Sequence, residues 1–447
     1  EAMARSELVL VAPSDYPLDV SPRADPPDLV VAAAAGLSVH RWTAFDEPPI
    51  HPEPMAVSAD AYVPSVRAAR GFTWALSLAS LADGLYAGEY LPIEAAEFAR
   101  ARCAGLRGRE CTRALYDWLL DTIEQGGFGD SLAATFQRKA GSRSRLMHAM
   151  LGAAGIDADL LLATSIDRDR TPSEVAEPSR YYHPVLFAAG TWFTVEHDEA
   201  PFGFLPPEIR GMPAVRLYPR AEGAHETILP DAAPGHDGLA ARFDLGVDAA
   251  TGEVRASGEM SLRGAPAADV REALLQRSPA DRENDLMTIF VSPTFPGADV
   301  EEVSIDGLDD REAPLVIRFA ARVPGFAARR GDRLILPPLV PQRLSGGYAP
   351  LPVVEHPALA FPPATIEVRA TIRAPGYAAG PHPGASVDRS GVRFSQAFER
   401  TGSGVSVQRN LSVSMARIEP PDYPAFADAI RRAESLWNVP LELRREP

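Results

Sequence analysis

The chain has 447 residues, and 46% of them are hydrophobic, a composition typical of globular proteins that excludes extensive disorder. At about 100–200 residues per domain, the length predicts about three domains. The formal net charge of −16 argues against a nucleic-acid partner, because no basic patch opposes the repulsion of a phosphate backbone. No apolar run reaches the roughly 18–20 residues of a transmembrane helix.

Lys139 is the only lysine, and the other basic residues are all arginine. Together with 43 prolines and abundant alanine, this bias indicates a bacterial genome rich in G and C. The chain begins with a strand pattern and shows no signal peptide, so we expect a fragment or a mature form of an extracytoplasmic, periplasmic protein.

Residues 1–58 alternate like strands and then become rich in proline, which predicts a β region followed by an extended connector. The segments TWALSLASLADGLY and PIEAAEFARARC have the apolar period of helices. The second of these helices ends at Cys103, and another begins near Cys111. A tight turn between them would allow a disulfide, and two buried free thiols are the alternative.

Residues 110–205 carry the most informative pattern. A helical segment, CTRALYDWLLDTIEQ, precedes a glycine-rich break, and SRLMHAMLGAAGIDA then predicts a buried helix. Two strands follow in YYHPVLFAAGTWFTVEHDEAPFGFLP. This order and spacing resemble the core of the transglutaminase-like superfamily, which has a papain-like fold.

The resemblance implies three catalytic positions, a Cys at the start of the central helix, a His at the next strand and an Asp on the strand after that. Counting back from Gly155 places Ala140 at the position of the family's cysteine. His183 matches the histidine, and Thr194 stands where the aspartate is expected. An alanine methyl cannot act as a nucleophile. The resemblance therefore predicts a pseudoenzyme.

In this interpretation the catalytic cleft of the family remains as a groove. Aromatic side chains line this groove and suit a protein or peptide ligand. The resemblance assigns to this groove Tyr182, His183, Trp192 and Phe193. The expected role is a non-catalytic binding or scaffold module of the bacterial envelope, with a protein or peptide ligand or other parts of a longer chain as its partners. No cofactor is expected.

Two alternatives remain open. In the first, Ser142 is a substitute nucleophile that acts with His183 and with Glu196 or Asp198, giving a hydrolase or acyltransferase. In the second, the core is only a spacer between β domains. Ser142 is more simply a helix N-cap that accepts hydrogen bonds from the first free amides. His148 is expected to be a packed or surface histidine.

The acidic run at residues 196–199 contains residue types that can bind metals. Consecutive strand residues alternate between faces and cannot converge on one ion, so no metal site is expected.

After residue 225 the pattern becomes β-rich. FDLGVDAATGEVRASGEMSLRG predicts a hairpin, APAADVREALL predicts a helix, and further strands follow. The terminal helix should dock through Phe426, Ile430 and Trp437. The prediction is an α+β protein with a papain/transglutaminase-like core flanked by antiparallel, β-sandwich-like domains. The expected divisions are residues 1–58, 59–225, 226–362 and 363–447.

Overall fold

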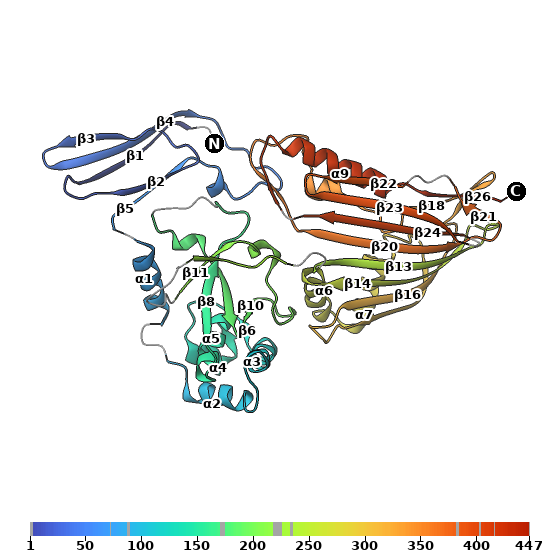
Figure 1. The fold of residues 1–447 in the computed structure, drawn as a ribbon, viewed down its shortest axis with the longest axis horizontal. Coiled ribbons are helices and arrows are strands. Elements are labelled where there is room, and N and C mark those ends of the chain that lie inside the picture. Colours follow the sequence, from blue (N-terminus) through green and yellow to red (C-terminus); the bar gives the residue numbers. More distant parts are fainter. Residues whose placement is uncertain are drawn as a thin grey trace. The chain divides into compact units, whose positions relative to one another are not determined.

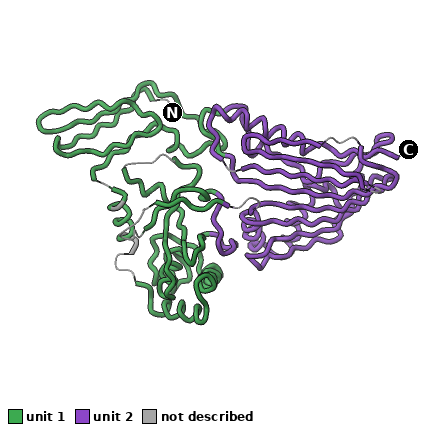
Figure 2. Tube along the Cα trace, viewed as in Figure 1, with its two compact units in different colours: residues 1–196, 208–231, 354–359 green, residues 197–207, 232–353, 360–447 purple. Residues whose placement is uncertain are grey.

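The computed structural model describes residues 3–71, 73–86, 90–169, 175–217, 226–232, 236–380, 384–401, 404–414 and 416–446. The chain divides into two compact units, which Figure 2 distinguishes by colour. Unit 1 comprises residues 1–196, 208–231 and 354–359, and unit 2 comprises residues 197–207, 232–353 and 360–447. Both units combine helices with antiparallel strands, so the predicted α+β class with β-rich flanking regions is confirmed.

The N-terminal strands of unit 1 form two small sheets. The three-stranded antiparallel sheet has the order β1-β4-β3, with β1 (Met3–Pro13), β3 (Val30–Ala34) and β4 (Leu37–Glu47). The intervening β2 (Asp19–Arg23) pairs instead with β5 (Ser65–Ala69). The strand pattern at the start of the sequence thus produces paired strands, as its alternation predicts.

The proline-rich connector packs against a later segment of the same unit. The Glu53 carboxylate accepts hydrogen bonds from the backbone N–H groups of Glu355, at 2.8 Å, and His356, at 3.0 Å. The imidazole of His356 stacks on the Tyr62 ring, with centroids 4.0 Å apart. These two rings and Trp42 help to line a cavity of about 890 Å³.

Five helices of unit 1 follow these strands in the chain and precede a five-stranded sheet. They are α1 (Trp74–Tyr86), α2 (Ile93–Arg102), α3 (Arg109–Thr122), α4 (Leu132–Arg138) and α5 (Arg143–Ala153). Short 3₁₀ turns occupy η1 (Ala59–Ala61), η2 (Pro178–Arg180) and η3 (Pro207–Ile209). The sequence pattern predicts an apolar face of Leu146, Met150, Leu151 and Ala154 for the central helix. The first three are buried in α5, as is Met147, whereas Ala154 is the C-cap residue and is half-buried.

The sheet beneath α5 has five antiparallel strands in the order β10-β9-β8-β11-β12 (Figure 1). Its strands are β8 (Ala158–Ala163), β9 (His183–Ala188), β10 (Thr191–Phe193), β11 (Pro213–Arg216) and β12 (Glu226–Ile228). The helix α5 packs against β8 and β9. This contact places α5 against β9, the strand that begins with the candidate residue His183.

Cys103 and Cys111 are joined in a disulfide, and their Cα atoms lie 4.8 Å apart. Cys103 is the C-cap of α2, and Cys111 lies in the first turn of α3. Both side chains are buried, so the bond fixes the turn between two helices from inside the unit.

We expect the Cys103→Ser, Cys111→Ser double variant to lose about 2–3 kcal/mol of unfolding free energy, because the disulfide restricts the unfolded chain over a short loop. Urea denaturation of both proteins measures this difference. Reduced wild type should match the variant, and equal midpoints for oxidised wild type and variant would contradict the prediction.

In unit 2, one eight-stranded sheet contains strands from both segments after residue 225 (Figure 1). Its order is β15-β16-β14-β13-β20-β24-β23-β22, and β13 pairs with β20 in parallel while the other neighbours are antiparallel. The strands are β13 (Gly238–Val247), β14 (Val254–Arg263), β15 (Asp299–Asp306), β16 (Leu315–Val323), β20 (Ala364–Arg373), β22 (Ala385–Arg389), β23 (Val392–Thr401) and β24 (Gly404–Val413). Residues 226–362 and 363–447 therefore contribute neighbouring strands to one sheet.

A four-stranded sheet of order β17-β18-β26-β21 completes the strand layers of unit 2. It comprises β17 (Ala328–Arg330), β18 (Arg333–Leu336), β21 (Tyr377–Ala379) and β26 (Leu441–Arg445). The short strands β19 (Ala358–Ala360) and β25 (Ala416–Ile418) belong to neither the eight-stranded nor the four-stranded sheet. The helical elements are α6 (Ala265–Leu275), α7 (Pro279–Leu286), the π-helical turn η4 (Met287–Val291), α8 (Leu344–Tyr348) and α9 (Tyr423–Trp437).

The C-terminal helix α9 packs against β22 and β23 (Figure 1). Its three expected docking residues, Phe426, Ile430 and Trp437, are all buried. The Trp437 indole N–H donates to the Val340 carbonyl at 2.8 Å, which satisfies the only polar group of this side chain. None of the helices in the described part of the chain is long and apolar enough to cross a membrane.

Candidate functional site

The segment before α5 is extended rather than helical. Ala140 and Gly141 form the short strand β7 (Ala140–Gly141), which pairs in parallel with β6 (Glu124–Gln125). Ser142 is the N-cap residue, and Arg143 is the first residue of α5. Ala140, the residue aligned with the family's cysteine, therefore lies three positions before the first helical residue.

Ser142 occupies the predicted N-cap position, but its hydroxyl makes no capping hydrogen bond. The expectation that it accepts from the first free amides is wrong. The side chain is fully buried instead, and its Oγ has no hydrogen-bond partner among the described residues. A serine becomes nucleophilic when an adjacent base takes its proton, so this hydroxyl lacks the contact that activation requires.

The buried guanidinium of Arg143 connects two backbone segments at the start of α5. Its Nε donates to the Ile123 carbonyl at 2.5 Å, and its Nη1 donates to the Val195 carbonyl at 3.4 Å. Ile123 follows α3, and Val195 lies beyond the end of β10. Arg143 thus holds the start of α5 against the segment after β10 that contains Thr194 and Val195.

The carboxylate at this site belongs to Glu196. Its Oε2 accepts a hydrogen bond from Gln125 Nε2 at 2.8 Å, and its Oε1 is buried without a partner among the described residues. Burial raises the pKa of Glu196 from 4.5 to about 7, and the nearby positive charge of Arg143 partly opposes this shift. Thr194 is buried and cannot replace a carboxylate, and its Oγ1 has no partner in the described part of the chain.

His183 begins β9, as predicted, and its imidazole contacts the Tyr182 ring at a centroid distance of 4.2 Å. The Tyr182 hydroxyl lies 2.8 Å from Ser165 Oγ, and the guanidinium of Arg168 lies 5.3 Å from the centre of the Tyr182 ring. Tyr182 remains 43% exposed. The Ser142 hydroxyl hydrogen-bonds to none of these groups.

The four residues of the predicted groove do not line one surface. In the β9–β10 pairing, Trp192 lies opposite Phe187, and their rings are 4.5 Å apart. Phe193 points to the other face, where it is fully buried and meets the Tyr116 ring of α3 edge to face at 5.8 Å. The inclusion of Phe193 in an open groove is wrong, because neighbouring strand residues face opposite sides of a sheet.

The other polar candidates, His148, Asp198 and Glu199, contact backbone groups or an arginine within their own unit. His148 is half-buried, its Nε2 lies 3.2 Å from the Ala158 carbonyl, and partial burial lowers its pKa. In unit 2, Glu199 forms an ion pair with Arg311 at 3.6 Å, and the Asp198 carbonyl accepts from Arg311 Nε at 2.7 Å. Within the described residues, no group of three or more His, Cys, Asp or Glu side chains is arranged to hold a metal ion.

Gln125 and Arg143 were not predicted from the sequence as site residues. One signal was available for Arg143, because Arg143 and Arg145 lie in the first turn of a helix that the apolar pattern predicts to be buried. Cations are unfavourable at the positive end of a helix dipole, so arginines at this place imply specific acceptors. Arg145 also has such acceptors, the carbonyls of Phe128 at 3.1 Å and Asp130 at 2.9 Å.

Comparison with known proteins identifies a fold but no family. No family model and no curated protein sequence matches the chain. A crystal structure from Parabacteroides distasonis, of a protein described provisionally as a protease, superimposes with a TM-score of 0.62. The match covers 99% of this chain and 73% of the other, at 14% sequence identity, and so indicates a similar fold.

Proposed function

We propose that this chain is a non-catalytic, transglutaminase-like protein that acts as a protein- or peptide-binding scaffold module of the bacterial envelope. The observation that carries the proposal is the environment of Ser142, a fully buried hydroxyl with no hydrogen-bond partner among the described residues. Ala140 offers only a methyl group in the preceding strand. Acyl transfer by the family mechanism needs a nucleophile and a base in contact, and neither residue supplies such a pair.

Several features support binding as the remaining role. Tyr182 is 43% exposed, and Trp192 is partly exposed beside Phe187. Aromatic side chains of this kind give large contact area at a small cost in side-chain entropy. The cavity of about 890 Å³ in the same unit has the size of a ligand-binding pocket. The Cys103–Cys111 disulfide supports an oxidising envelope compartment.

The competing function is a hydrolase or acyltransferase that uses Ser142 with His183. We expect a fluorophosphonate probe to leave the folded protein unlabelled, because the buried Ser142 hydroxyl has no activating base. Mass spectrometry of the intact protein and of its peptides measures the labelling, and the Ser142→Ala variant is the control. Stoichiometric labelling at Ser142, absent from that variant, would establish the enzyme instead.

Binding is tested on the same preparation. Immobilised wild-type protein is incubated with an envelope extract of the source bacterium, and the Tyr182→Ser, Trp192→Ser double variant is compared with Tyr90→Ser. Tyr90 is 85% exposed and provides a matched surface change outside the β9–β10 region. The double variant should lose a captured protein or peptide that wild type and Tyr90→Ser retain. Identical capture by all three proteins would refute the proposal that Tyr182 and Trp192 contribute to ligand binding.

A further inference from the structure

Arg409 breaks the apolar row on one face of β24. The strand reads GVSVQRNLSV, and its inward residues are Val405, Val407, Arg409, Leu411 and Val413. All five are buried, and Arg409 is only 3% exposed. An arginine at a core position of an alternating strand is uncommon, because taking the charge out of water costs several kcal/mol unless it is paired.

The described residues provide almost no compensation for this charge. Arg409 Nη2 donates to the neutral carbonyl of Val439 at 3.1 Å, and Nε has no partner. No carboxylate of the described residues forms an ion pair with Arg409. Burial lowers its pKa to about 10, so the guanidinium still carries its charge at neutral pH.

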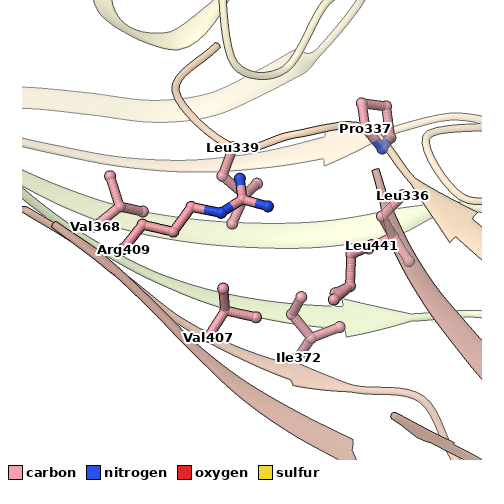
Figure 3. A pocket seen from close by; sticks show the side chains of 8 residues that line it. All are labelled: Leu336, Pro337, Leu339, Val368, Ile372, Val407, Arg409 and Leu441. Atoms are coloured by element: carbon pink, nitrogen blue, oxygen red, sulfur yellow. The ribbon is translucent and has the colours of Figure 1, made fainter. Parts of the chain in front are cut away.

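The guanidinium lies beside a small apolar cavity within unit 2 (Figure 3). The cavity measures about 10 Å³, and its walls come from the eight-stranded sheet and from the four-stranded sheet with its adjoining loop. Apart from Arg409, the lining comprises Leu336, Pro337, Leu339, Val368, Ile372, Val407 and Leu441. A volume of this order holds about one water molecule. Among anions, only a monoatomic one is of comparable size.

We propose that this cavity binds a single monovalent, monoatomic anion of the chloride class, which pairs with the Arg409 guanidinium. The cavity is too small for acetate, phosphate or sulfate, and the apolar lining offers a larger anion no further donors. A water molecule would satisfy one N–H group but would leave the charge unbalanced. A chloride ion accepts from the guanidinium and makes the buried site electrically neutral.

Chloride titration followed by ³⁵Cl NMR line broadening tests the site directly in solution. The full-length chain should broaden the chloride resonance, and Arg409→Met should lose most of that effect. Arg369→Met is the matched control, because Arg369 is exposed and lies next to Val368 on the same sheet. Equal broadening by wild type and Arg409→Met would overturn the proposal.

Stability gives a second readout. At constant ionic strength, replacing gluconate by chloride should raise the folding equilibrium constant of wild type about tenfold for each tenfold rise in chloride above its dissociation constant. The Arg409→Met variant should show no chloride-specific gain. If that variant does not fold, a bromide-soaked crystal of the wild-type protein tests whether an anion binds beside Arg409. An anomalous peak beside Arg409 supports the site, and density for water alone overturns it.

Discussion

Replacing Gly141 by alanine is expected to lower the free energy of unfolding by about 3–5 kcal/mol, through backbone strain and steric overlap together. Gly141 has a φ of +144°, a conformation that L-residues rarely adopt. An added Cβ would also overlap Thr135 Oγ1. Thr135 is fully buried, and its hydroxyl donates to the Ser131 carbonyl at 2.9 Å, so it cannot move away without losing that bond.

The matched control is Gly152→Ala in α5. Gly152 has ordinary helical geometry, and no atom would lie within 4 Å of an added Cβ. Its replacement should therefore stabilise the protein slightly, by about 0.5–1 kcal/mol. Urea denaturation of the two variants and wild type measures both effects. Coinciding midpoints for Gly141→Ala and Gly152→Ala would mean that the β6–β7 segment tolerates a side chain and does not fix the start of α5.

Local patterns in the sequence predicted the helices α1, α2, α3, α5, α6 and α9 and the start of the central helix near Ser142. Such features depend on neighbouring residues, as in the apolar period of α5 and the docking residues of α9. The same local rules could also have excluded Phe193 from the groove, because Trp192 and Phe193 are adjacent on one strand and must face opposite sides. The family resemblance places both residues in the groove, but the alternation of a strand allows only one of them to face it.

The polar centre, formed by Gln125, Arg143 and Glu196, could not be predicted from local patterns, because it depends on contacts between distant residues. Gln125 and Glu196 are separated by 71 positions, and Arg143 reaches backbone carbonyls that lie 20 and 52 positions away from it in the chain. Counting from Trp192 placed the family carboxylate at Thr194, whereas the buried carboxylate is Glu196, two residues later. The parallel pairing of β13 with β20 is another long-range contact. No local pattern in the sequence shows whether these two strands belong to one sheet or to two separate domains.

The Glu196→Gln variant is expected to be more stable than wild type above pH 7 and nearly equal to it near pH 4.5. Burial raises the pKa of Glu196 from 4.5 to about 7, so the folded state holds this proton more tightly than the unfolded state. The stability that the bound proton contributes is fully present below pH 4.5, and it is lost progressively as pH rises to about 7. Above that pH the loss amounts to roughly 1–3 kcal/mol.

Glutamine keeps the size of Glu196 and its contact with Gln125 but does not ionise, so the variant should not show this loss. Denaturation midpoints measured from pH 4.5 to pH 8.5 give the difference, and Glu97→Gln on the exposed surface of α2 should follow the wild-type profile. Parallel profiles for wild type and Glu196→Gln would show that water reaches the carboxylate. The centre beside Ser142 would then be open to solvent, and the case against catalysis there would lose its physical basis.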